Sequence, residues 1–197
     1  MTALRPDLAI IARHVAAGAR VLDIGCGDGV LLEALRDKGC DARGMEIEAE
    51  AVARCVAKGL SVIQGDADAD LAFYPDQSCD YAILSETLQT MMRPDRVLEE
   101  LLRIAGHAFV SFPNFAHWRV RASLLLGGRM PVTRLLPVAW YETPNIHHLT
   151  VADFRDFVAA RGIRVEASWF LSGDRVIAPG LANWRAEHAV FLISRQM

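Results

Sequence analysis

The sequence predicts an α/β fold, a parallel β-sheet with helices on both faces. Three observations lead to this fold class. Short β-like runs alternate with helical patterns up to Pro113, and a βαβα order is typical of a parallel sheet covered on both sides. Glycines stand where two of the helical patterns end, at Gly39 and Gly59. The 197 residues are 52% hydrophobic, so we expect residues 1–197 to form one domain with a sizeable core.

The elements of the sheet are expected in a regular order. Leu8, Ile11 and Val15 follow helical spacing, and Pro6 suits the first turn of that helix. Runs rich in apolar residues predict strands at residues 20–24, 42–47, 60–64, 80–84 and 108–112. Between them, apolar side chains at helical spacing predict helices at residues 30–38 and 48–58, and a further helix that begins at Pro94.

The end of the chain predicts one more helix and two closing strands. Thr150 and Asp153 have the spacing of a capping box, and Gly162 is expected to end the helix that they begin. The strands are expected at residues 164–171 and 188–195. Because their connection is short and shows no convincing helix, we expect them to form an antiparallel pair.

Residues 114–149 differ from the rest of the chain, because they show little periodicity and a single acidic residue, Glu142. The segment combines arginine with aromatic residues: Arg119, Arg121, Arg129, Arg134, Phe115, Trp118, Trp140 and Tyr141. Trp, Tyr and Arg are enriched at the energetic centres of protein interfaces. Three uses remain open for this irregular segment: a docking surface, a lid over an acceptor pocket, or a packed extension. We favour docking.

Composition excludes several classes of protein. The 21 Lys and Arg against 24 Asp and Glu give a net charge of −3, whereas domains that bind nucleic acid are usually basic. No apolar run approaches the roughly 18 residues that span a membrane, and the first residues lack the apolar core of a signal peptide. We therefore expect a cytoplasmic protein. No pair of its four cysteines has the spacing of a zinc or redox motif, and we expect no metal.

The motif with the most chemical content is Val21-Leu22-Asp23-Ile24-Gly25-Cys26-Gly27-Asp28-Gly29, at the junction of the first strand and the next helix. Glycines there allow a tight turn and a close approach of backbone to ligand. A dinucleotide fingerprint has Gly or Ala at its sixth position, where this chain has Val30. Asp23 and Asp28 would also repel a pyrophosphate. S-adenosylmethionine has no phosphate and carries an ammonium and a sulfonium. We therefore expect that ligand, with Asp23 ordering the loop and helping to bind the ammonium.

Further candidate residues stand at strand ends, where ligands of such sheets bind. Glu46 is placed to accept hydrogen bonds from both ribose hydroxyls, and Asp66 from the adenine amino group. Ser85, with Glu86, is expected near the methionyl group. Structural alternatives remain: helix caps for Glu46 and Glu86, a turn residue for Asp66, and a turn without ligand for the glycines. The candidate cofactor residues are Asp23, Gly25, Cys26, Gly27, Gly29, Glu46, Ile47, Asp66, Ala67 and Ser85. No pattern identifies a catalytic base.

These residues resemble class I S-adenosylmethionine-dependent methyltransferases over roughly residues 8–112 and the terminal strands. Within that superfamily the whole chain resembles the MetW family of bacterial methionine-biosynthesis proteins. The resemblance rests on residues 21–29, 84–89 and 93–98. It rests above all on Ser111-Phe112-Pro113-Asn114-Phe115-Ala116-His117-Trp118-Arg119-Val120-Arg121, on Gly127-Gly128-Arg129-Met130-Pro131 and on Trp140-Tyr141-Glu142-Thr143-Pro144-Asn145-Ile146-His147.

The resemblance implies a Rossmann-like methyltransferase fold, in which a seven-stranded, mostly parallel sheet has its last strand antiparallel. It implies S-adenosylmethionine or S-adenosylhomocysteine as ligand, and a MetX-type homoserine O-acyltransferase as the partner that this chain activates or regulates. The candidate contacts with that partner are Trp118, Arg119, Arg121, Arg129, Trp140 and Tyr141. The alternative is an active methyltransferase that acts on an unidentified small molecule or protein.

Overall fold

One mixed β-sheet organises the protein. The computed structural model describes residues 4–133 and 136–195. The strands are β1 (Arg20–Ile24), β2 (Asp41–Glu46), β3 (Ser61–Gln64), β4 (Cys79–Ser85), β5 (Ala105–Pro113), β6 (Ile163–Ser172), β7 (Arg175–Ile177) and β8 (His188–Arg195). Their order across the sheet is β3-β2-β1-β4-β5-β8-β6-β7. The first five strands pair in parallel, and β8 runs antiparallel to β5. The α/β class and the antiparallel last strand are confirmed.

The sheet has eight strands, so the expectation of seven was wrong. The added strand is β7, which turns back from β6 as a hairpin and pairs with residues 170–172. Gly173, with φ +56°, makes that reversal possible. The three residues of β7 are too few to show an alternating pattern, which explains why the sequence did not reveal them. The antiparallel pairing of β6 with β8 is confirmed.

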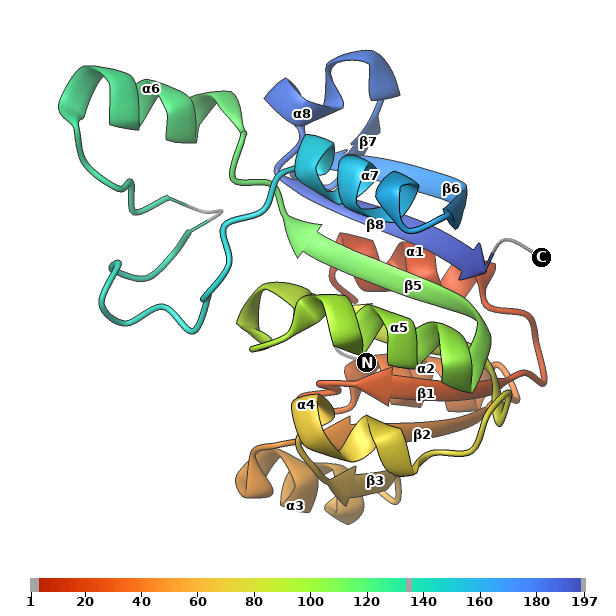
Figure 1. Ribbon diagram of the computed structural model, residues 1–197. Coiled ribbons are helices and arrows are strands. Elements are labelled where there is room, and N and C mark those ends of the chain that lie inside the picture. The colour runs from red at the N-terminus through yellow and green to blue at the C-terminus, as the bar shows by residue number, and fades with distance from the viewer. Residues whose placement is uncertain (1–3, 134–135, 196–197) are drawn as a thin grey trace.

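Helices cover both faces of the sheet (Figure 1). The principal helices outside residues 114–149 are α1 (Pro6–His14), α2 (Val30–Asp37), α3 (Ala49–Ala57), α5 (Pro94–Ile104) and α7 (Val151–Ala160). The short helices are α4 (Ala67–Asp70), η1 (Leu71–Phe73), η2 (Leu88–Thr90), η3 (Pro179–Leu181) and α8 (Ala182–Arg185). Within the described part of the chain, no helix is long and apolar enough to cross a membrane.

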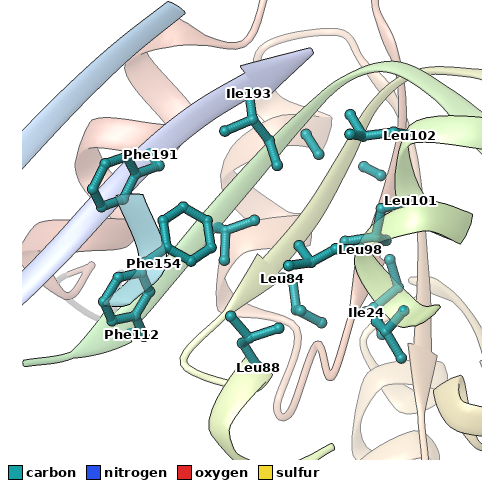
Figure 2. Close-up of a cluster of buried hydrophobic side chains, with 14 of the residues drawn as sticks. Ile24, Leu84, Leu88, Leu98, Leu101, Leu102, Phe112, Phe154, Phe191 and Ile193 are labelled. Atoms are coloured by element: carbon teal, nitrogen blue, oxygen red, sulfur yellow. The ribbon is translucent and has the colours of Figure 1, made fainter. Parts of the chain in front are cut away.

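Two apolar layers fix the helices to the sheet. On one face, α5 and α7 pack on the strands through a cluster that includes Leu101, Phe154 and Phe191, and Figure 2 shows how these side chains meet over the sheet. On the other face, α1 and α2 pack through a cluster that includes Ile11, Leu35 and Phe109. The central strands β1, β4, β5 and β8 are thus largely buried on both sides, which explains their mostly apolar sequences.

The described residues of the segment 114–149, which are 114–133 and 136–149, are called the arm below and stand away from the sheet (Figure 1). The arm contains a helix that the sequence pattern did not predict, α6 (Trp118–Gly127). Its apolar residues lie all around the axis, and only Val120 is buried, so the sequence shows no one-sided stripe. On this helix Arg119 and Arg121 point in different directions, because residues two positions apart do not share a helix face. Arg134, the fourth arginine of the segment, lies outside the described residues.

Candidate ligand site at the carboxyl edge of the sheet

The order of the strands reverses between β1 and β4, because chain order runs outward from β1 through β2 and β3 and from β4 through β5. In open α/β sheets, ligands bind beyond the carboxyl ends of the strands at such a reversal. The residues predicted from the sequence come from the ends of β1, β2, β3 and β4. The fold therefore gathers them along one edge of the sheet.

The glycine loop joins β1 to α2 at that edge. Gly25 and Gly29 have φ of +71° and +74°, values that L side chains rarely adopt. A methyl group added to Gly25 would lie 2.6 Å from Thr87 Oγ1, and one added to Gly29 would collide with Leu60 and lie 2.9 Å from Cys55 Sγ. The loop is therefore packed tightly against its neighbours at Gly25 and Gly29, where no side chain would fit.

Glu46, at the end of β2, is tied directly to this loop. Its Oε2 accepts a hydrogen bond of 2.8 Å from the backbone nitrogen of Gly27, and its Oε1 accepts one of 3.0 Å from Glu48. A carboxylate has about four acceptor positions, so two remain for a ligand. Ile47 follows with its side chain exposed, next to the backbone that leads into α3.

The end of β3 lies beside Glu46, because Gly65 donates its backbone N–H to the carbonyl oxygen of Glu46 at 3.0 Å. Asp66 follows and caps α4, since its Oδ1 accepts a bond of 3.0 Å from the nitrogen of Asp68. Ala67 is buried behind it. The sequence left a turn residue as the alternative for Asp66. In the structure Asp66 caps a short helix and is also an exposed carboxylate at the same edge as Glu46.

Asp23 lies under the loop and is 2% exposed. Burial raises the pKa of Asp23 to about 7. The positive charge of Arg5 works against that rise, and the negative charges of Glu46 and Asp7 add to it. A carboxyl in this setting gains from a cation placed beside it, because an opposite charge favours the ionised form.

Ser85, at the end of β4, belongs to a buried polar network. Its hydroxyl donates to Asp7 Oδ2 at 2.9 Å, and the hydroxyl of Ser111 donates to the same oxygen at 2.9 Å. Arg5 Nη2 donates to Asp7 and to Ser85 Oγ. Neither Arg5 nor Asp7 was predicted from the sequence as a site residue. A signal existed for Asp7, since it stands four and eight residues before Ile11 and Val15, on the buried face of α1.

Glu86 continues this cluster toward β8. Its backbone has φ +52°, and its Oε1 lies 2.6 Å from Nδ1 of His188. Burial works to raise the pKa of Glu86, but the hydrogen bond with His188 and the charge of Arg5 outweigh it and hold that pKa below its usual value. Glu86 is therefore an ionised group between two basic side chains.

The next residues connect the site to the arm. The carbonyl oxygen of Gln89 accepts hydrogen bonds from the nitrogens of Ile146 and His147, at 2.9 and 3.0 Å. At the other end of the arm, the buried Asn114 accepts from the nitrogens of Ala116 and Val151. The arm thus begins and ends at one asparagine and touches the loop after β4.

The surface of the arm is apolar and aromatic. Leu125 and Leu126 on α6 are each 85% exposed, and Trp140 and Tyr141 are 75% and 70% exposed. Not every predicted contact residue is free. The guanidinium of Arg121 stacks on Trp184 and its Nε donates to the carbonyl oxygen of Ala116 at 2.6 Å, whereas Arg119 lies over its neighbour Trp118.

The fold matches many solved structures, several of which are described as S-adenosylmethionine-dependent methyltransferases. A methyltransferase of that class from Mesorhizobium loti has a TM-score of 0.71 at 21% identity, over 95% of this chain and 96% of that one. A structure described as the [4+2]-cyclase SpnF has a TM-score of 0.68 at 18% identity, over 96% of this chain and 80% of that one. At these identities the likeness establishes the fold alone.

Sequence comparisons are more specific. The bifunctional methionine biosynthesis protein MetXA/MetW of Rhodopirellula baltica is 32% identical over 206 residues, which cover 98% of this chain and 33% of that protein. A ubiquinone biosynthesis O-methyltransferase of Paraburkholderia phymatum is 33% identical over 74% of this chain and 65% of that protein. The chain thus spans from a third to about two-thirds of these relatives' lengths. The model of a family described as methionine biosynthesis protein MetW matches residues 5–193.

Proposed function

The chain belongs to the MetW family of methionine biosynthesis proteins, and on that premise we propose that it binds S-adenosylmethionine and acts as the activating or regulatory partner of a MetX-type homoserine O-acyltransferase. The observation that carries the proposal is the bifunctional relative. There, a region that matches 98% of this chain occupies a third of a longer protein whose name also includes MetXA. Two functions joined in one chain have a high effective concentration for each other.

The geometry of the site supports the ligand. Glu46 stands beside the glycine loop with acceptor positions left for a ribose, and Asp66 is exposed at the end of the next strand. Asp23, buried below the loop, suits a ligand with a positive charge. In this arrangement the adenosine lies over β2 and β3, and the methionyl group lies toward β1 and β4. The cofactor residues predicted from the sequence keep these roles in the proposal.

The exposed surface of the arm supports the proposal of a protein partner. Exposed apolar patches of this kind mark interaction sites, and the centre of an interface is enriched in Trp, Tyr and Arg. We assign the contact to two exposed apolar pairs, Leu125 and Leu126 on α6 and Trp140 and Tyr141 later in the arm, together with Trp118, Arg119 and Arg129. Arg121 bonds to Ala116 and stacks on Trp184. We therefore expect it to support the contact indirectly, by holding the base of the arm in place.

The deciding experiment measures homoserine acylation by the cognate acyltransferase with and without this chain, each with and without S-adenosylmethionine. We expect the rate to rise when the chain is present. Formation of S-adenosylhomocysteine is followed in the same reactions. A rate that this chain leaves unchanged, with or without the ligand, would overturn the role of partner.

Variants locate the contact. We expect Trp140→Ala to weaken binding to the acyltransferase about tenfold or more, as removal of a central aromatic residue commonly does, and to leave S-adenosylmethionine binding unchanged. Phe73→Ala is the matched control, because Phe73 is an equally exposed aromatic residue outside the arm. Equal effects of the two variants on partner binding would contradict the assignment.

A further inference from the structure

The side chain of Arg5 reaches from the start of α1 to the carboxyl edge of the sheet. Its Nη1 lies 3.1 Å from Glu86 Oε2, and its Nη2 lies 2.9 Å from Ser85 Oγ and 3.2 Å from Asp7 Oδ2. Ser85 and Glu86 are 80 and 81 positions away in sequence. The contacts hold the guanidinium at the end of β4, beside the reversal of strand order.

Asp7 fixes that position. Its Oδ2 accepts hydrogen bonds from Arg5, Ser85 and Ser111 at once, and the residue is buried. A buried carboxylate that receives several hydrogen bonds is costly to move. Asp7 therefore orients Arg5, whereas Arg5 itself remains half exposed. A guanidinium has five N–H donors, so the bonds of Arg5 to Asp7, Ser85 and Glu86 leave donors for a ligand.

The charges around Arg5 match one end of the proposed ligand. Asp7, Asp23 and Glu86 are carboxyls within its electrostatic reach, so this part of the site offers acids to a cation and one arginine to an anion. The methionyl group of S-adenosylmethionine carries an α-ammonium and an α-carboxylate. In the proposed arrangement, with the adenosine over β2 and β3, this group lies at the β1 and β4 end of the site, where Asp23 and Arg5 stand within electrostatic range of each other. A carboxyl such as Asp23 favours the ammonium, and a cation such as Arg5 favours the ligand's carboxylate.

We propose that Arg5 binds the α-carboxylate of the methionyl group and so makes the site selective for ligands that retain it. This inference rests on the proposed function, because it presumes S-adenosylmethionine as the ligand. It adds a specificity-determining residue outside the glycine loop and the strand ends. It also gives α1 a role in ligand recognition, since Arg5 directly precedes that helix.

The test crosses a change in the ligand with a change in the residue. Isothermal titration calorimetry of the full chain compares S-adenosylmethionine with decarboxylated S-adenosylmethionine, which has the same sulfonium and amine but no carboxylate. We expect the unaltered protein to bind the former about 10- to 100-fold more tightly, the range of a charge-assisted hydrogen-bonded pair. Arg5→Gln should bring the two affinities to within about threefold, by weakening only the carboxylate-bearing ligand. Arg5→Lys should restore part of the preference.

Arg13→Gln is the control, since it removes a charge from the same helix at its other end, and it should retain the full preference. Thermal unfolding of each variant confirms that it is folded. If Arg5→Gln keeps the preference, or if the unaltered protein shows none, the role of Arg5 is wrong while S-adenosylmethionine binding stands. If the unaltered protein binds neither ligand, the proposed cofactor fails first and the role of Arg5 fails with it.

Discussion

Asn114 holds both ends of the arm, and its replacement by alanine is the sharpest test of how the arm is built. Its Oδ1 accepts hydrogen bonds from the nitrogens of Ala116 and Val151, at 3.2 and 3.3 Å. Its Nδ2 donates to the carbonyl oxygen of Ala186 at 2.9 Å, with Ala182 and Asn183 within 3.5 Å. One buried amide therefore joins the arm, the start of α7 and the end of α8.

The expected cost follows from the groups left without partners. In Asn114→Ala the N–H groups of Ala116 and Val151, both buried, lose their acceptor. Each buried unsatisfied group costs about 1–3 kcal/mol. Because both bonds are long, we expect the lower part of the summed range, about 2–4 kcal/mol. That is a large share of a stability of about 5–15 kcal/mol, but the protein should still fold.

Urea denaturation measures the loss, since a lower midpoint at unchanged slope reports a change in stability alone. Limited trypsin digestion measures the arm, because Arg119 and Arg129 on it become easier to cleave if its ends separate. Asn145→Ala is the control in the same segment. A loss below about 1 kcal/mol, together with unchanged cleavage of the arm, would refute the reasoning.

Three further predictions concern the site. Glu46→Gln should weaken S-adenosylmethionine binding by about 1–3 kcal/mol in calorimetry. Both carboxylate oxygens of Glu46 accept hydrogen bonds from backbone N–H groups, and the amide N–H group of Gln would face one of these donors. Undiminished affinity would exclude Glu46 as a ligand residue. Burial raises the pKa of Asp23 to about 7, so affinity for the ligand should rise roughly tenfold from about pH 5.5 to pH 7 as that carboxyl ionises. The ligand's amine, with a pKa of about 7.7–8.0, stays mostly charged over this range. Asp23→Asn should show no such dependence on pH, and a similar rise in that variant would assign the titration to another group. Gly29→Ala should lower the urea midpoint more than Gly39→Ala, because both glycines have positive φ but only the methyl group at residue 29 meets Leu60 and Cys55; equal losses would show that φ alone sets the cost, at about 1–2 kcal/mol.

The regular part of the fold could be predicted because burial and sequence pattern coincide there. The strand predicted at residues 188–195 is β8 (His188–Arg195), and Thr150 and Asp153 form the capping box that their spacing indicated. Both belong to elements whose apolar side chains are buried in the two layers that flank the sheet. Where that condition fails, the prediction fails as well. α6 has a single buried residue, and β7 has three residues at an edge.

The sequence predicted which residues lie together at the candidate site, but not the hydrogen bonds that join them. Glu46 and the glycine loop lie together as the sequence suggested, because they end neighbouring parallel strands. The inward hydrogen bond of Ser85 could not be read from its position, since it depends on Asp7, 78 residues earlier. Arg5 was missed for the same reason, because two of its partners, Ser85 and Glu86, stand 80 and 81 positions later in the sequence.

The short loop after β4 has a thermodynamic consequence. Thr87 packs against the glycine loop through Gly25, and the carbonyl oxygen of Gln89, two residues later, holds Ile146 and His147 of the arm. If a ligand shifts this loop, it changes the free energy of whatever binds the arm, and linkage makes the effect reciprocal. For the proposed acyltransferase partner, the factor by which the ligand alters the affinity for the partner must then equal the factor by which the partner alters the affinity for the ligand. Measured from both sides, that single number gives the coupling free energy between the two surfaces.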